Sequence, residues 1–328
     1  MRPLPFAPRP LAGEGLSSWV ARLAFHNFVT PADLWADLGS DDVTDLAPND
    51  SLLKRLSART RLDVHDLRRR FASGLAAAAP LALSEPGATR GAACPACCRA
   101  TAEVGGDHFV STASASVWRF SCPEHRIRLV DLDGYALVLQ AGAARFLREG
   151  TSLVIGATAL TSRLAAATLA LEETMMSALG GRAPGPEWLP RTATSFLASA
   201  TTLIEMVLWR PMGGFPFAHR FDEIGNNGSP TAFVEPDDRR RGVGLLADLS
   251  PRHRLNVCAA LATLLARPAA RRHPDAMLMD WNDPDRPGPF AFMIGEFDGR
   301  LRELIARRIE TWPDCIATSA RQALREAR

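Results

Sequence analysis

Lysine is almost absent from this chain of 328 residues: Lys54 is the only one, and the formal net charge is +2. Nearly all of the positive charge is therefore carried by arginine, whose planar guanidinium group suits bidentate contacts with phosphate or guanine. A genome rich in G and C, which also favours Ala, Pro and Gly, explains the same bias. The near-zero net charge excludes nucleic-acid binding through a uniformly basic surface, so any such binding must come from local patches.

The signatures of common catalytic sites are also missing. The sequence has no Gly-x-x-x-x-Gly-Lys phosphate loop, no dinucleotide-binding fingerprint, no Gly-x-Ser-x-Gly turn and no His-Glu-x-x-His pair. Two acidic groups, Asp222-Glu223 and the aspartates of residues 280–285, could serve as Mg²⁺ ligands of a nuclease. Carboxylates in loops are usually only solvated, however. We therefore predict that the chain is not an enzyme.

Long apolar runs and a secretory cysteine pattern are absent as well. Four of the six cysteines lie in residues 94–122 and the other two are isolated, which is not the pattern of a secreted disulfide framework. The most apolar run, residues 152–171, is interrupted by Arg163 and is a poor membrane span. No apolar segment typical of a signal peptide follows the first residues. We predict a soluble, cytoplasmic protein that does not contact a membrane.

The most specific motif of the chain lies in residues 94–125. Two matched pairs with a two-residue spacing occur there, and three thiolates with one imidazole make a complete tetrahedral ligand set for Zn²⁺ that leaves no position for water. Such a set favours one structural zinc ion. The spacing lets a tight turn direct both side chains of a pair at the ion while its backbone N–H groups face the sulfurs. The predicted ligands are Cys94, Cys97, Cys122 and His125.

Other interpretations of these four residues remain open. A Cys-Pro-x-Cys pair also occurs in thioredoxin-like redox folds, but the Ala- and Pro-rich residues 76–90 do not show the βαβ pattern that such a fold needs. The residues could also be ordinary reduced cysteines and a surface histidine. Cys98 or His108 could replace one member of the set. Residues 110–120 alternate in polarity and predict a strand leading into the second pair, so the favoured interpretation is a zinc ribbon.

The residues before this motif predict four short amphipathic helices. Apolar residues recur with a helical period from Glu14 to Ala24. A second helix is expected to begin at Thr30, which caps it, with Pro31 in the first position, and to end at Gly39 in the left-handed conformation. Two further helices are expected over Ser51–Ala58 and Asp63–Ala72, the last one capped by Asp63. The first two helices and their tight junction resemble a helix-turn-helix.

If this module binds DNA, its basic residues are the candidate phosphate contacts. The alternative is a helical bundle that packs against the zinc module and exposes solvated basic faces. The candidate nucleic-acid contacts are Arg22, Lys54, Arg55, Arg68, Arg69 and Arg70.

The order of these motifs resembles the TniQ family, the target-selection proteins of bacterial transposons. The resemblance covers about residues 3–135. It rests on Leu4-Pro5-x-x-Pro8-Arg9-Pro10, Gly13-Glu14-x-Leu16-x-Ser18-Trp19-Val20-x-Arg22-Leu23-Ala24, Cys94-Pro95-x-Cys97, Trp118-Arg119, Cys122-Pro123-x-His125 and Leu129. Two differences stand out: Asn27-Phe28 replaces a common Asn-Gly, and Arg126 replaces a glycine found in many members. The second zinc module of some relatives is also missing.

What the resemblance implies is a DNA-associated adapter with no chemistry of its own. Members of the family engage target DNA or an RNA-guided DNA-targeting complex, and they pass that location to an ATPase regulator and the transposase. The expected partners are therefore DNA and these transposition proteins, and the sequence also allows a homodimer. The alternatives are a zinc-dependent transcription regulator and a protein-interaction scaffold that does not touch DNA.

The overall expectation is a mainly α-helical protein, and its hydrophobic content of 47% is enough for two or three domains. We expect a helix-turn-helix-like module at residues 1–85, a zinc ribbon at 86–140 and a partner-facing helical region at 141–328. Within the last region, helices are expected at 151–179, 192–209, from Ser250-Pro251 onward, 290–311 and up to residue 328.

Overall fold

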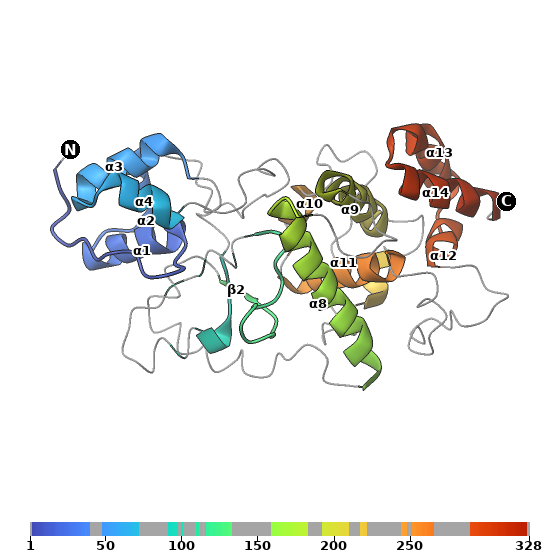
Figure 1. Ribbon diagram of the computed structural model, residues 1–328, viewed down its shortest axis with the longest axis horizontal. Coiled ribbons are helices and arrows are strands. Elements are labelled where there is room, and N and C mark those ends of the chain that lie inside the picture. The colour runs from blue at the N-terminus through green and yellow to red at the C-terminus, as the bar shows by residue number, and fades with distance from the viewer. Residues whose placement is uncertain are drawn as a thin grey trace. The chain divides into compact units, whose positions relative to one another are not determined.

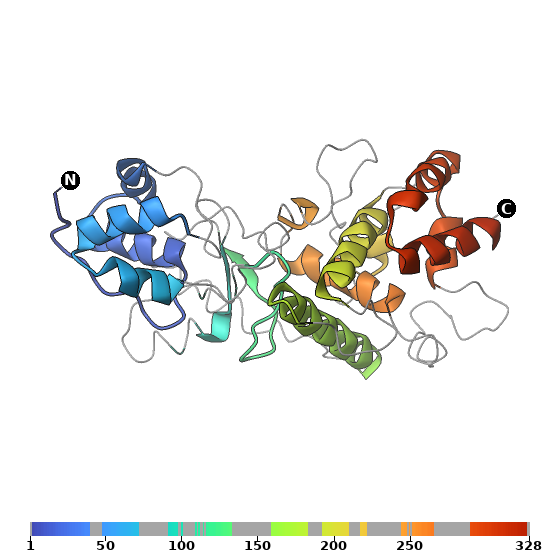
Figure 2. The same cartoon turned by 45° about the horizontal axis from the view of Figure 1, so that its top comes forward.

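The protein is mainly helical in the computed structural model, and the chain divides into two compact units, Met1–Val154 and Ile155–Arg328 (Figures 1 and 2). Both domain boundaries expected from the sequence, after residues 85 and 140, lie outside the described residues. The structure describes residues 2–39, 48–71, 91–97, 100, 109, 111, 114, 116–132, 159–182, 192–209, 217–221, 244–247, 249, 251–265 and 289–326.

The first unit begins with four short helices whose ends follow the capping residues in the sequence. The Thr30 hydroxyl accepts a hydrogen bond from the backbone N–H of Asp33 at 3.1 Å, and Gly39 ends the second helix with a φ of 60°. The Asp63 carboxylate accepts from the backbone N–H groups of His65 and Asp66. The three predicted caps are therefore confirmed. The helices are α1 (Leu16–His26), α2 (Pro31–Leu38), α3 (Asp50–Thr60) and α4 (Val64–Phe71).

These four helices share one apolar core because each of them turns an apolar face inward. Trp19 of α1 and Phe71 of α4 stack with ring centroids 5.5 Å apart, and both side chains are fully buried. A core contributed by all four helices supplies the tertiary packing that helices of 8 to 11 residues need, since isolated helices of this length are marginal in water. The other large members of the core include Leu16, Leu23, Leu38, Leu52, Leu56 and Leu67.

The proline-rich segment before α1, residues 3–10 and here called the lead, is held by side chains at the two ends of that helix. The indole N–H of Trp19 donates to the carbonyl of Pro8 at 2.8 Å, and the amide of Asn27 exchanges two hydrogen bonds with the backbone of Phe6. The lead belongs to neither a helix nor a strand, so its backbone N–H and C=O groups have no partners in regular secondary structure. These hydrogen bonds to side chains satisfy some of them. The lead is thereby fixed over α1.

The turn after α1 contains one of the two departures from the TniQ pattern. Phe28 has a φ of 56°, which is unusual for a bulky residue, and the residue is 93% exposed. A glycine at this position would adopt the same backbone without strain. Phe28 therefore adopts a left-handed backbone that a glycine would also accept.

Two short strands flank the Cys/His segment of the first unit. β1 (Gly91–Ala93) and β2 (Val130–Leu132) pair antiparallel, with Ala92 opposite Asp131. The prediction of a strand over residues 110–120 is wrong, because the described residues of that range form no extended strand. Arg119 N–H instead donates to the carbonyl of Ser116 at 2.9 Å, and the Ser116 hydroxyl accepts from the N–H of Trp118. Serine side chains that bond nearby backbone groups favour turns over ladder pairing.

All secondary-structure elements described in the second unit are helices. Within it α8, α9 and α11 pack against one another, and α14 packs against α12 and α13. Its helices are α8 (Ala159–Leu179), α9 (Ala193–Leu208), η4 (Phe217–Phe221), α10 (Gly244–Ala247), α11 (Pro251–Leu264), α12 (Pro289–Gly295), α13 (Gly299–Arg308), η7 (Ile309–Thr311) and α14 (Asp314–Glu326).

Two details of the second unit bear on the sequence expectations. The helix expected over residues 290–311 is interrupted because the Asp298 carboxylate accepts from the N–H of Leu301 and starts a new helix there. Cys258, expected as a core residue, is 1% exposed in α11. None of the described helices is both long and apolar enough to cross a lipid bilayer.

Candidate metal centre and basic surface

The Cys/His cluster is formed by two tight turns that lie next to the β1–β2 pair. Cys94 directly follows β1, and the second turn, which holds Cys122 and His125, precedes β2. This second turn is closed by two backbone hydrogen bonds of 2.9 Å, from Arg126 N–H to Cys122 O and from Cys122 N–H to Ile127 O. Arg126 has a φ of 56°, which explains why glycine suits this position. The two-stranded pairing thus brings the two half-sites together.

The distances within the cluster match the edges of a tetrahedron around zinc. With Zn–S near 2.3 Å and Zn–N near 2.0 Å, a tetrahedral site requires about 3.8 Å between sulfurs and about 3.5 Å between sulfur and nitrogen. The sulfurs of Cys97 and Cys122 are 3.7 Å apart. His125 Nδ1 lies 3.7, 3.3 and 3.6 Å from the sulfurs of Cys94, Cys97 and Cys122. The residues present therefore fit a single tetrahedral ion.

Backbone donors point at the sulfurs as the two-residue spacing predicts. Cys97 N–H donates to Cys94 Sγ at 3.5 Å, and His125 N–H donates to Cys122 Sγ at 3.4 Å. Cys94 and Cys122 are buried among Ala92 and Leu129, whereas His125 is exposed. Such bonds stabilise thiolates, the form in which cysteine binds a metal. The four ligand atoms lie within 4.8 Å of one another and could hold a metal ion.

The three thiols differ in how readily they ionise. A hydrogen bond from Cys94, together with the N–H groups of the second turn, lowers the pKa of Cys122 to about 4. Burial and the negative charge on Cys122 raise the pKa of Cys97 to about 12. The pKa of Cys94 is also raised, first because its thiol donates to Cys122 and then because it is buried. One thiolate therefore forms easily, and two thiols keep their protons until a cation arrives.

We expect zinc uptake by the metal-free protein at pH 7 to release at least two protons per ion, from Cys94 and Cys97, and a third from Cys122 where the metal-free segment is unfolded and this thiol keeps its ordinary pKa. Because protons compete with the metal for the cysteine sulfurs, zinc affinity should rise as the pH rises through the neutral range and should fall in acid. Titration calorimetry in two buffers with different ionisation enthalpies measures the proton count. Uptake without net proton release would contradict this assignment of charges.

The alternative ligands and the catalytic alternative lie outside the described residues. Cys98 and His108 are not among them, nor are Asp222, Glu223 and the aspartates of residues 280–285. Among the described residues, only the four predicted ligands form a group of Cys, His, Asp or Glu side chains that could hold a metal ion.

Arg22 is a correction to the predicted DNA contacts. Its guanidinium group donates to both carboxylate oxygens of Glu14, at 2.7 and 3.0 Å, and to the carbonyl of Arg9 at 2.8 Å. The side chain is only 3% exposed, so it cannot reach a phosphate on the protein surface. The sequence predicts Glu14 only as the start of a helix. The buried pair instead connects the lead to α1.

The remaining candidate contacts lie in α3 and α4, and most of them have partners in the protein. Lys54 and Arg68 both bind the carboxylate of Asp50, and their hydrogen bonds lower the pKa of Asp50. Arg69 pairs with Asp66 but keeps 81% of its side chain exposed. Arg55 donates to the last carbonyls of α2, at Leu38 and Gly39, and so caps that helix.

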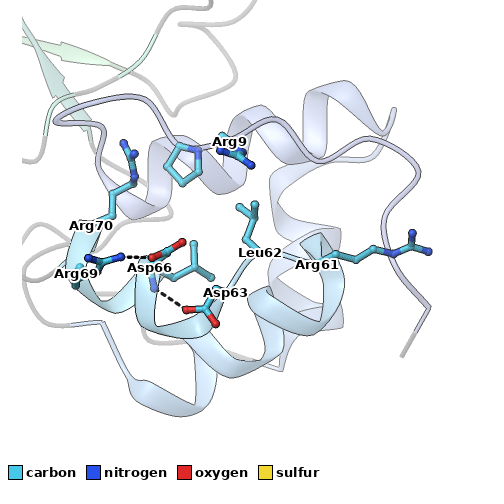
Figure 3. Close-up of a pocket in the computed structure, with 9 residues that line it drawn as sticks. Arg9, Arg61, Leu62, Asp63, Asp66, Arg69 and Arg70 are labelled. Carbon is cyan, nitrogen blue, oxygen red and sulfur yellow. Dashed lines mark hydrogen bonds and ion pairs between the residues drawn. The ribbon is translucent and has the colours of Figure 1, made fainter.

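Arg70 differs from these residues because its guanidinium group has no ion pair within the described structure. It lines a pocket of about 770 Å³ formed by residues 9–10 of the lead, the turn at residues 61–63 and α4 (Figure 3). Arg9 and Arg61 line the same pocket, and sequence reasoning assigned neither of them to a site. No local pattern could have found them, because 52 positions separate these two arginines (61 − 9) and only the fold brings the two segments together.

Comparison with protein-family models gives a match to the family described as TniQ, over residues 5–129. The matched range contains the lead, α1 to α4 and all four residues of the Cys/His cluster. No curated protein matches the chain. No solved structure matches it either.

Proposed function

The match over residues 5–129 supports membership of the TniQ family, and from that premise we propose that the chain is a target-selection adapter in DNA transposition. In this role it binds DNA, other transposition proteins or both, and it carries out no catalysis. The observation that carries the proposal is the family match, because the matched range includes both the helical module and the Cys/His cluster. The role in transposition follows from the family, whereas the individual contacts are our own assignment.

The proposed metal is one structural Zn²⁺ held by Cys94, Cys97, Cys122 and His125. The donor set and the distances between the ligand atoms support zinc, since all four tetrahedral positions are filled by protein atoms. When bound, the ion cross-links the turn after β1 to the turn before β2. Its proposed task is to hold the two turns together as one folded site.

The proposed DNA-contacting surface consists of exposed basic side chains of α3 and α4. Lys54 and Arg69 are well exposed, with 64% and 81% of their side-chain surface accessible, and Arg68 is 37% exposed. Because these residues are already paired with Asp50 or Asp66, a phosphate would have to compete with a carboxylate for each of them. Direct DNA binding by this surface should therefore be weak and sensitive to salt.

Duplex binding at varied salt concentration tests this proposal. We expect wild-type protein to bind a labelled random-sequence duplex at low salt, with an affinity that falls steeply as salt is added. The Lys54→Gln/Arg68→Gln variant should lower the slope of log K against log salt by about two, roughly one for each lost phosphate contact. The control variant Arg307→Gln/Arg325→Gln removes two exposed charges from the second unit and should leave the slope unchanged.

If wild-type protein does not bind the duplex at low salt, the proposal of direct DNA recognition by this chain is wrong. The pairing of Lys54, Arg68 and Arg69 with carboxylates favours the second candidate function in that case. That function is an adapter that contacts only proteins and reaches DNA through them. Neighbouring transposase and ATPase genes would support transposition in either case.

A further inference from the structure

We propose that the pocket between the lead and α4 binds an acidic peptide segment of a partner protein, one in which carboxylate and apolar side chains alternate. The inference rests on the proposed adapter function and names the chemistry of one partner. The pocket has a volume of about 770 Å³, enough for several side chains of an extended peptide.

Three arginines without an ion pair among the described residues line this pocket. Most arginines of α3 and α4 are paired with a carboxylate or donate to a helix end, as described above. The guanidinium groups of Arg9, Arg61 and Arg70 make no ion pair and no hydrogen bond with the described residues, and all three residues line the pocket. Figure 3 shows the side chain of Arg61 extending away from those of Arg9 and Arg70. Arg9 and Arg70 are therefore the two cations most available to one ligand.

The pocket also contains apolar and acidic groups, and these decide between two classes of ligand. Pro10 and Leu62 offer apolar contact beside the guanidinium groups, and Asp63 and Asp66 lie on the same wall (Figure 3). A nucleic-acid backbone carries a negative charge on every nucleotide, so it cannot avoid placing charge beside Asp63 and the apolar groups. A peptide can place carboxylates at the arginines and apolar side chains at Pro10 and Leu62. The mixed lining therefore favours a peptide.

The position of Arg9 is set before any ligand binds. The carbonyl of Arg9 accepts from Arg22, whose guanidinium group is itself held by Glu14, and Trp19 holds the preceding Pro8. A pocket whose backbone is already ordered loses little conformational entropy on binding. The motif that begins α1 thereby positions a surface cation for recognition, in addition to its role in the core.

Fluorescence anisotropy on the full chain tests the proposal. The probe is a short labelled peptide of alternating Glu, Leu and Asp residues, and the same peptide with Gln and Asn in place of the acids is the uncharged control. We expect wild-type protein to bind the acidic probe only. Arg9→Gln should weaken binding about tenfold or more, the expected effect of losing one charge-assisted contact, and Arg9→Gln/Arg70→Gln should weaken it further.

Controls separate this inference from the proposed DNA binding. Arg307→Gln/Arg325→Gln should bind the acidic peptide as wild type does, and Arg9→Gln should bind duplex DNA as wild type does. Peptide affinity that is absent in wild type, or unchanged in Arg9→Gln/Arg70→Gln, would overturn the proposal. If Arg9→Gln instead loses duplex binding while the acidic peptide does not bind, the pocket holds a nucleic-acid backbone. A wild-type protein that binds the peptide but no DNA would refute direct DNA recognition alone.

Discussion

A Cys94→Ser/Cys122→Ser variant is expected to lose its zinc and the folded structure of the Cys/His segment. Structural zinc sites in small peptides contribute about 10–16 kcal/mol of apparent binding free energy near pH 7. This exceeds the total stability of many domains, which is about 5–15 kcal/mol. The described strands of the segment are too short to hold the two turns together, because β1 and β2 have three residues each. Metal binding and folding should therefore be lost together.

Metal content by mass spectrometry and thermal unfolding followed by tryptophan fluorescence measure this loss. Trp118 lies only four residues before Cys122 and is fully buried, so its emission should shift to the red when the segment unfolds. Cys258→Ala is the matched control, because Cys258 is buried in α11 and is far from the cluster in sequence. It should retain about one zinc per chain. A double-serine variant without zinc but with the wild-type unfolding temperature would show that the metal has no structural role.

Arg22→Met is expected to destabilise the first unit by about 3–5 kcal/mol, the usual cost of leaving one charge of a buried pair without its partner. Glu14 is 1% exposed and would keep a buried carboxylate, which also accepts hydrogen bonds from the Leu11 N–H and the Ser18 hydroxyl. The lead would also lose the bond to the carbonyl of Arg9. Denaturant unfolding of the full chain, with the transition of the first unit followed by fluorescence, measures the free energy.

A second variant distinguishes the buried charge from simple loss of packing. Glu14→Gln/Arg22→Met removes both charges and should recover most of the lost stability, because replacing a whole buried pair by uncharged residues is often nearly neutral. If the double variant is as unstable as Arg22→Met, the unpaired carboxylate is not the cause.

The pH dependence of Arg22→Met follows from the pKa of Glu14. Burial raises this pKa above its ordinary value even in the presence of Arg22. A carboxyl whose pKa is higher in the folded state than in the unfolded state favours folding when protonated, and this contribution is lost as the pH rises through the folded pKa. Without Arg22 the pKa should rise further. The stability gap between Arg22→Met and wild type should therefore narrow as the pH is lowered from neutral.

The helix ends and the Cys/His cluster could be predicted because their causes are local. Thr30 and Asp63 cap helices through bonds to residues two or three positions away, and Gly39 needs only its own left-handed conformation. Two-residue spacings bring each pair of metal ligands into one turn in the same way. The error at residues 110–120 has the opposite origin. Alternating polarity predicted a strand, but the Ser116 hydroxyl accepts from the local backbone, at the N–H of Trp118.

The helical class, the helix caps, the four candidate metal ligands and the resemblance to the TniQ family could all be predicted from the sequence, since each depends on residues close together in the chain. Which arginines are available to a ligand depends instead on the folded structure. Arg22 was a surface candidate in the sequence, but folding buries it against Glu14. Arg9 became a pocket residue because the lead lies against the turn before α4. Burial and charge pairing depend on residues that are distant in the chain and meet only in the folded unit.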